Sequence, residues 1–108
     1  IVKEWAAKWG TIVVLKGAFT LIASPNGICR VSPFANPILA TGGTGDILCG
    51  IIAGLAAQGM SLEDAASCGV YLHAAAAEQL KQSRGYRGTT ASDLLEILPG
   101  STKAIMEI

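Results

Sequence analysis

The strongest constraint on the fold is a run of β-branched residues that follows a short amphipathic segment. Residues 11–17 read TIVVLKG, without alternation between polar and apolar positions. Such a run predicts a strand that is buried on both faces, as in a parallel sheet covered by helices. The preceding segment, 1–9, has apolar residues at helical spacing, and Gly10 is a typical helix end. We therefore expect a layered α/β fold in which residues 11–16 form an interior strand.

The rest of the chain predicts a β-hairpin followed by packed helices. Pro25-Asn26-Gly27 lies between two β-branched segments, and Asn-Gly is a strong hairpin signal. Downstream, helices are indicated by apolar runs, by Ser61 as a cap with Asp64 three residues later, and by the ability of Pro99 to end a helix. The expected elements are a hairpin over 20–32, a helix over 44–58, an Ala-rich helix from Ser61 to 82, a short helix from 90 or 92 to Pro99, and a last turn within 101–108.

Composition excludes several classes of protein and partner. The 108 residues contain 8 Lys+Arg and 8 Asp+Glu, so no basic surface for nucleic acid is indicated. The longest uncharged apolar run, 47–60, is interrupted by glycines and is shorter than the roughly 20 residues that span a bilayer. The three cysteines match no zinc or disulfide pattern, which favours a reducing compartment. We expect a cytoplasmic protein with no nucleic-acid partner and no membrane partner.

A glycine-rich stretch, LATGGTGDILCG over 39–50, places one carboxylate at the start of an uncharged helix. A helix N-terminus offers unpaired N–H groups and partial positive charge, and glycines allow a phosphate to approach closely. Gly42, Gly43 and Gly45 therefore read as a phosphate cradle, although the P-loop and dinucleotide patterns are both absent. Asp46 could then take a proton from a reacting hydroxyl. The alternative is that the glycines form a turn and that Asp46 only offsets the helix dipole; from the residues alone the two interpretations have equal weight.

Other polar residues are weaker candidates. Lys16 follows the predicted strand, where ligands bind in open α/β sheets, but it could equally extend into solvent. His73 lies on the small-residue face of the Ala-rich helix, which favours a packed structural histidine over a ligand. Arg84 and Arg87 lie in a glycine-containing loop and are expected to be solvated, with an approach to a phosphate as the alternative.

Four segments together resemble a known family. LKGAFTLIASPNG, NPILATGGTGDILCGIIAGLAAQG, YLHAAAAE and TTASDLLEILP are similar to the ADP- or ATP-dependent NAD(P)H-hydrate dehydratases of the ribokinase-like superfamily. The likeness runs from about Thr11 to Pro99. One departure is that Ala35 and Ile38 flank the Asn-Pro pair, where the family usually has glycines.

The resemblance implies both an activity and a site. It implies a lyase that restores NADH or NADPH from their hydrates, with ADP or ATP as the phosphoryl donor and Mg²⁺ as an assisting ion whose ligands this chain does not reveal. Asp46 would face the hydrated nicotinamide ring and accept the hydroxyl proton. The nucleotide would bind along Lys16, Gly17, Ala18, Phe19 and Thr20, and along Gly42, Gly43, Thr44 and Gly45.

The resemblance also implies that residues 1–108 are one C-terminal fragment of a ribokinase-like nucleotide-binding domain. The segment that precedes them in the family supplies most of the sheet and much of the substrate pocket, so we expect the fragment alone to be inactive. The whole protein is expected to be a homo-oligomer. Two alternatives stay open from the sequence: a vitamin-precursor kinase of the same superfamily, and a non-catalytic nucleotide-binding module.

Overall fold

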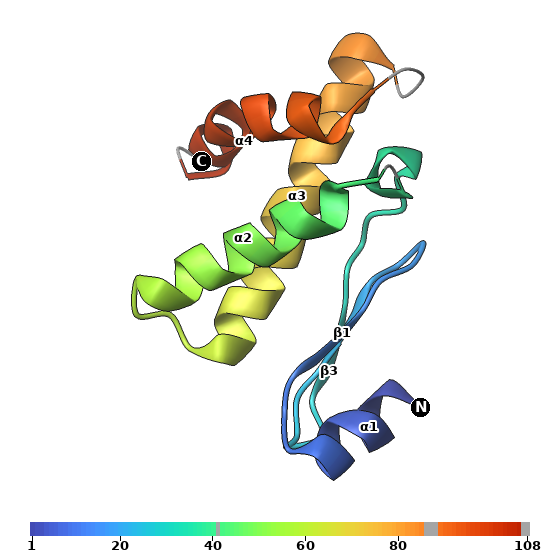
Figure 1. The fold of residues 1–108 in the computed structure, drawn as a ribbon, viewed down its shortest axis with the longest axis vertical. Coiled ribbons are helices and arrows are strands. Elements are labelled where there is room, and N and C mark those ends of the chain that lie inside the picture. Colours follow the sequence, from blue (N-terminus) through green and yellow to red (C-terminus); the bar gives the residue numbers. More distant parts are fainter. Residues whose placement is uncertain (41, 86–88, 107–108) are drawn as a thin grey trace.

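The structure, a computed structural model, describes residues 1–40, 42–85 and 89–106, with side chains described as far as residue 103. Helices and strands follow the order expected for an α/β fold that ends in helices (Figure 1). The elements are α1 (Val2–Trp9), β1 (Val13–Leu15), β2 (Leu21–Ala23), β3 (Cys29–Val31), the short 3-10 helix η1 (Pro37–Ala40), α2 (Thr44–Ala57), α3 (Leu62–Arg84) and α4 (Ala91–Met106).

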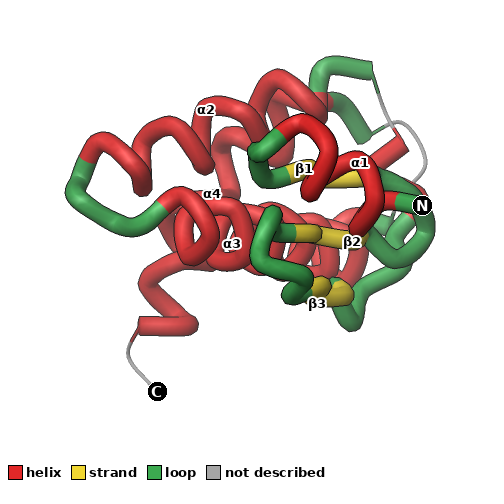
Figure 2. Tube along the Cα trace, turned by 90° about the horizontal axis from the view of Figure 1, so that it is seen from below, coloured by secondary structure: helices red, strands yellow, loops and turns green. Residues whose placement is uncertain are grey.

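The three strands form an antiparallel sheet in the order β1-β2-β3 (Figure 2). The hairpin prediction over 20–32 is confirmed, with Leu21 opposite Val31. Its turn is closed by a hydrogen bond from the Gly27 N–H to the Ser24 carbonyl, and Gly27 has φ +94°, a conformation that favours glycine. The prediction of an interior parallel strand over 11–16 is wrong for the described sheet. β1 is an edge strand and pairs antiparallel with β2 alone.

Contacts with helices on both faces of β1 explain why its sequence resembles that of an interior strand. On one face Val13, together with β2 and β3, packs on Val2 and Ala6 of α1. On the other face Val14 joins a cluster with α2 and α3 that includes Leu48. Helices therefore cover both faces of the sheet, as Figure 1 shows for α1 and the α2–α3 pair, and the layered α/β/α expectation is confirmed.

The two central helices agree with the sequence prediction. α2 spans Thr44–Ala57, and the Ser61 hydroxyl caps α3 by accepting a hydrogen bond from the Asp64 N–H at 3.2 Å. Their close approach depends on Gly69, because a Cβ added there would lie 2.6 Å from Cγ1 of Ile52. A residue without a side chain is thus required where the two helices cross.

The prediction that Pro99 ends the last helix is wrong. α4 continues through Pro99 to Met106. A proline in a helix removes one hydrogen bond and disfavours the preceding turn, but packing can outweigh that cost. Here Leu94 is fully buried against α3, and Ile97 and Leu98 pack on the same cluster. Ser101, one turn farther along, is buried as well, so tertiary contacts hold both sides of the proline in one helix.

Two aromatic residues of α1 lie on the surface rather than in the core. Trp5 and Trp9 are 39% and 60% exposed, and their ring centroids are 4.9 Å apart. The smaller side chains Val2 and Ala6 occupy the contact of α1 with the strands.

Candidate functional site

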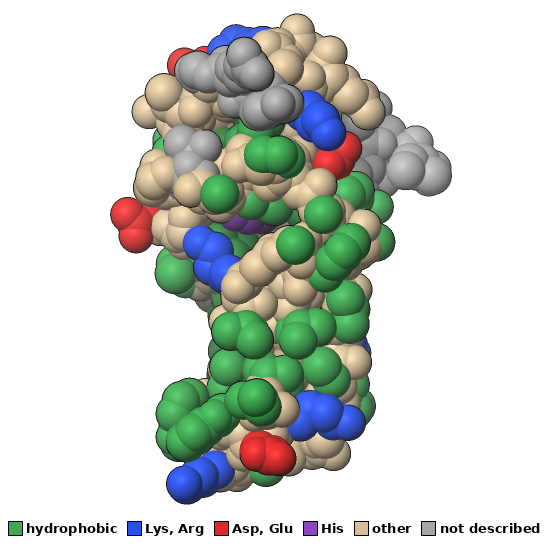
Figure 3. Space-filling model, turned by 90° about the vertical axis from the view of Figure 1, so that its right-hand side faces the viewer, with side chains coloured by type: hydrophobic (Ala, Val, Ile, Leu, Met, Phe, Trp, Pro, Cys, Tyr) green, Lys and Arg blue, Asp and Glu red, His purple; other side chains and the backbone are tan. Residues whose placement is uncertain are grey.

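One cavity of about 850 Å³ lies where the β1–β2 loop, the glycine-rich loop and α3 meet. Cavities of about 300–1,000 Å³ are typical of small-molecule sites. In Figure 3 a hollow is visible on this face, with the only histidine of the chain at its base. The lining residues are Lys16, Gly17, Ala18, Thr20, Ser32, Ala35, Asn36, Pro37, Leu39, Ala40, Gly42, Gly43, Thr44, Gly45, Asp46, Leu48, Val70, His73 and Ala74.

The N-terminal end of α2 forms one wall of this cavity. Gly43 is the residue before the helix and has φ +91°, a left-handed conformation that side chains rarely adopt. The first turn of a helix presents backbone N–H groups and partial positive charge. The glycine-rich loop thus turns sharply into a helix whose positive end borders the cavity.

Lys16 adds a formal positive charge beside that helix end. It follows β1 directly, and its amine lies where a side chain on Gly45 would be, because a Cβ added to Gly45 would be 2.7 Å from Lys16 Nζ. Lys16 and Gly45 are 29 residues apart in the sequence, and the fold brings them into contact. A lysine amine next to a helix N-terminus is a suitable environment for phosphate.

Asp46 lies in the first turn of α2, is exposed, and lines the same cavity. No hydrogen bond or ion pair joins its carboxylate to another described residue. A carboxylate that only offset the helix dipole would need no cavity in front of it. Its position allows it to accept a proton from a bound ligand.

A hydrogen-bond chain fixes the loop that precedes α2. The Asn36 carboxamide donates to Oε1 of Glu78 on α3 at 3.0 Å and accepts from the Ile38 N–H at 2.9 Å, which starts η1. At the end of η1, the Leu39 carbonyl accepts a hydrogen bond from Oγ1 of Thr44 at 2.9 Å. The glycine-rich loop is therefore anchored to α3 through η1, and its position is determined by the tertiary structure.

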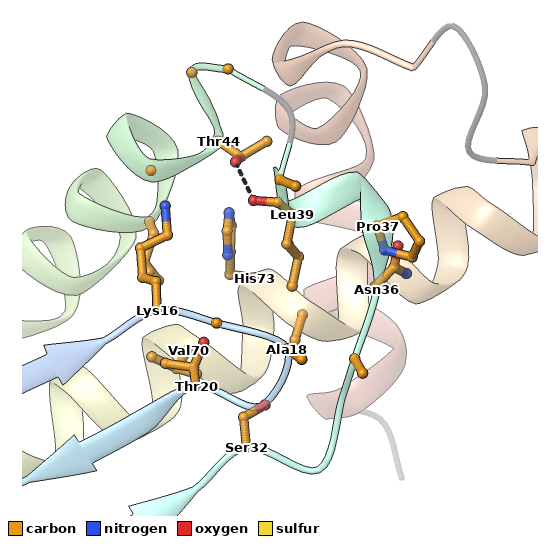
Figure 4. A pocket seen from close by; sticks show the side chains of 18 of the residues that line it. Lys16, Ala18, Thr20, Ser32, Asn36, Pro37, Leu39, Thr44, Val70 and His73 are labelled. Atoms are coloured by element: carbon orange, nitrogen blue, oxygen red, sulfur yellow. Dashed lines mark hydrogen bonds between the residues drawn. The ribbon is translucent and has the colours of Figure 1, made fainter.

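His73 forms the floor of the cavity. Its side chain is 3% exposed, and its Nε2 atom has no hydrogen-bond partner among the described residues. Burial lowers the pKa of His73 below its ordinary value of 6.5; a hydrogen bond to the Thr44 backbone opposes this shift, and the charge of Lys16 adds to it. Figure 4 shows the ring beside Lys16, pointing toward the Thr44 end of α2.

The structure brings together nearly all the predicted site residues. Of the ten positions, only Phe19 does not line the cavity, and its side chain is 55% exposed. His73, expected to be a packed structural residue, is buried but also lines the cavity. Arg84 lies outside the cavity and forms an ion pair with Asp93 at 3.0 Å, whereas Arg87 lies outside the described residues.

Ser32 and Asn36 also line the cavity but were not predicted as site residues. The Asn-Pro motif of the resemblance was the available signal for Asn36. Ser32 follows β3 and carries no comparable pattern.

Neither a metal-binding cluster nor a membrane-spanning helix is found in the described part of the chain. It contains no group of three or more His, Cys, Asp or Glu side chains placed to hold a metal ion. None of its described helices combines the length and the apolar character that crossing a membrane requires.

Comparison with known proteins agrees with the features of the cavity. A bifunctional NAD(P)H-hydrate repair enzyme of Moorella thermoacetica is 48% identical over 99 residues, which are 92% of this chain and 19% of that protein. An ADP-dependent (S)-NAD(P)H-hydrate dehydratase of Bacillus subtilis is 43% identical over 97 residues, which are 90% of this chain and 35% of that protein. The chain thus spans between a fifth and about a third of the length of these relatives.

Solved structures show the same agreement. The fold matches the crystal structure of an ADP/ATP-dependent NAD(P)H-hydrate dehydratase from Bacillus subtilis, co-crystallised with ATP/Mg²⁺, with a TM-score of 0.90 at 42% identity. That match covers 95% of this chain and 37% of the other. A ribokinase-like superfamily protein from Enterococcus faecalis matches with a TM-score of 0.76 at 33% identity, covering 94% and 35%. Residues 1–100 match the carbohydrate-kinase-like family described as NAD(P)H-hydrate dehydratase, and the chain belongs to that family.

Proposed function

We propose that the protein to which this chain belongs restores NADH and NADPH from their hydrated forms, with ADP or ATP as the phosphoryl donor. The observation that carries the proposal is the presence, in one cavity, of a helix N-terminus, a lysine amine and a carboxylate that has no partner among the described residues. The first two features suit the phosphates of a nucleotide, and the third suits a reacting hydroxyl. The names of the relatives favour this reaction over that of a vitamin-precursor kinase.

The nucleotide would bind between the segment 16–20 and the glycine-rich loop. Lys16 supplies positive charge, Gly45 leaves space beside the amine, and the first turn of α2 supplies N–H donors. Because the described residues offer no cluster for a metal ion, Mg²⁺ would depend on the phosphate oxygens of the nucleotide. Phe19 would contribute its backbone at most, since its side chain lies outside the cavity.

Asp46 is proposed as the general base. The nucleotide supplies the phosphoryl group that makes the ring hydroxyl a leaving group. Asp46 would accept the hydroxyl proton as the new oxygen–phosphorus bond forms and the terminal phosphoanhydride bond of the donor breaks, which releases AMP from ADP or ADP from ATP. Inorganic phosphate then departs as the carbon–oxygen bond of the ring breaks, and the adjacent ring carbon loses a proton to water, which restores the double bond. The Lys16 amine and the α2 N-terminus would stabilise the negative charge of the transferred group.

We also propose that residues 1–108 are the C-terminal part of a single nucleotide-binding domain and are inactive alone. The aligned residues are only 19% and 35% of the length of these relatives, which supports that interpretation. β1 is an edge strand whose Leu15 is 52% exposed, so a further strand could extend the sheet there. Homo-oligomer formation by the whole protein stays a prediction.

The test of Asp46 is the variant Asp46→Asn in the complete protein. The amide keeps the shape of the side chain but cannot accept the proton, so turnover of hydrated NADH should fall by about 10²–10⁴-fold. Turnover is measured as the nucleotide-dependent return of reduced-nicotinamide absorbance, with ADP affinity measured separately by calorimetry. ADP should bind at least as well as before, because a negative charge near the phosphates is removed.

The same assay distinguishes the alternatives. Near-normal turnover by Asp46→Asn would refute the role of the general base. Accumulation of a stable phosphorylated product, without return of the reduced nicotinamide, would indicate a kinase instead of a dehydratase. Binding of nucleotide without any turnover by the unaltered protein would indicate a non-catalytic module.

A further inference from the structure

The imidazole of His73 is a buried polar group with an unused donor or acceptor. Buried side-chain nitrogens are nearly always hydrogen-bonded, because leaving one unpaired is costly. His73 is 3% exposed, and its Nε2 has no partner among the described residues. A purely structural histidine would be expected to use both ring nitrogens. The lack of a partner for Nε2 therefore indicates that a ligand bound in the cavity pairs with it.

The surroundings of the ring indicate which ligand would suit it. Lys16, after β1, and Asp46, on α2, are the other charged side chains that line the cavity, while β3 and η1 contribute the uncharged Ser32 and Asn36 nearby. Figure 4 shows His73 and Lys16 side by side, both pointing toward the Thr44 end of α2. The lysine amine and the helix end both favour an anion at this point.

We propose that His73 is a phosphate-binding residue, whose Nε2 N–H donates a hydrogen bond to a phosphate oxygen of the bound nucleotide. The inference rests on the proposed function and gives His73, at the floor of the same site, a role in binding the nucleotide. Nε2 is covered in the empty cavity, so a neighbouring group must move to admit the oxygen. Lys16 is suited to that movement, because its exposed amine is the far end of a flexible side chain.

Binding of phosphate by His73 should be accompanied by proton uptake. A hydrogen bond to the Thr44 backbone opposes the effect of burial on the pKa of His73. A neutral imidazole has one N–H and a protonated imidazole has two, so the protonated form donates from Nε2 whichever nitrogen carries the proton of the neutral ring. In the free protein, burial and the charge of Lys16 hold the pKa of His73 below 6.5. A phosphate beside the ring favours the protonated form and raises that pKa, so nucleotide binding should be accompanied by proton uptake.

The test compares two variants of the complete protein by calorimetry. His73→Leu fills similar space without a donor, and His73→Gln keeps a donor near Nε2 but cannot titrate. ADP titrations in buffers with different ionisation enthalpies give the number of protons bound. The phosphate of ADP also titrates near neutrality, so the readout is the difference between wild type and variant in the number of protons bound. Gln79→Leu, at an exposed position on the same helix, is the matched control.

We expect His73→Leu to weaken ADP binding about 10- to 100-fold, as for loss of a hydrogen bond to a charged group. Adenosine, which has no phosphate, should bind both proteins alike. His73→Gln should retain most of the ADP affinity, and both variants should lose the proton uptake that wild type and Gln79→Leu share.

Three further outcomes separate a failure of this inference from a failure of the proposed function. Wild-type ADP affinity and proton uptake in His73→Leu would overturn the role of His73 while leaving the nucleotide site intact. Equal weakening of ADP and adenosine would overturn it too, because that result indicates a packing role. Failure of the unaltered protein to bind ADP would overturn both proposals.

Discussion

The contact between Gly45 and Lys16 allows a single methyl group to test the proposed nucleotide site. In Gly45→Ala the added Cβ would lie 2.7 Å from Lys16 Nζ, whereas ordinary contacts of a Cβ begin at 3.4 Å. The amine must therefore retreat by about 0.7 Å or more, and the methyl group occupies space beside the first turn of α2. Gly45 is not in the left-handed region, so alanine adopts its backbone conformation without strain.

The expected effects on affinity and on stability have opposite signs. Displacing one charge-assisted contact to phosphate costs about 1.5–3 kcal/mol, which corresponds to roughly 10- to 100-fold weaker ADP binding. Replacing a helical glycine by alanine stabilises a helix by up to about 1 kcal/mol, so the melting temperature should be unchanged or higher. A variant that is equally stable but binds ADP weakly would place the defect at the site rather than in folding.

The matched control is Gly50→Ala on the same helix. A Cβ added to Gly50 meets nothing within 4 Å, so this variant should gain helix stability while ADP affinity stays unchanged. Calorimetry gives the affinities, and thermal melts of the complete protein give the stabilities. Equal ADP affinity for wild type and Gly45→Ala would refute the placement of phosphate beside Lys16. Equal weakening by both variants would do so as well.

Two further predictions concern stability. In Gly69→Ala the added methyl group would overpack against Ile52, which costs about 1–3 kcal/mol of stability, while the higher helix propensity of alanine offsets part of that loss. The melting temperature of the variant should therefore fall. An unchanged melting temperature would contradict the close crossing of α2 and α3. The pKa of His73 is lowered in the folded state, so the unfolded chain binds its proton first and stability should decrease as the pH falls below about 6.5. Denaturant titrations of wild type and His73→Gln, at pH values from about 5 to 8 that bracket the ordinary histidine pKa, give the free energy of unfolding. That free energy should decrease less at acid pH in His73→Gln than in wild type.

Local patterns were sufficient to predict most elements and several of the site residues. The Pro25-Asn26-Gly27 turn, the Gly10 end of α1 and the Ser61 cap each depend on a few neighbouring residues, and each is confirmed. The glycines around residue 43 and the carboxylate at Asp46 were also visible, because a helix N-terminus is a local feature. These inferences hold because backbone conformation and capping are decided within one or two turns of chain.

Contacts between distant segments decided the remaining features. The β-branched run before Lys16 indicated a strand with other elements packed on both of its faces, but only the strand pairing shows that β1 is an edge strand. Pro99 stays within α4 because Leu94 and its neighbours pack on α3, and the free energy of that packing outweighs the local preference of proline.

The sequence by itself determined that the chain is an α/β unit with a glycine-rich loop before a helix that carries one carboxylate in its first turn. Only the tertiary structure placed Lys16 against Gly45 and set the His73 ring, whose Nε2 has no partner among the described residues, at the floor of the same cavity. A helical pattern shows which face a residue lies on but not what that face meets. His73 therefore resembled a core residue in the sequence, because burial and a role in a site both select the inner face of a helix.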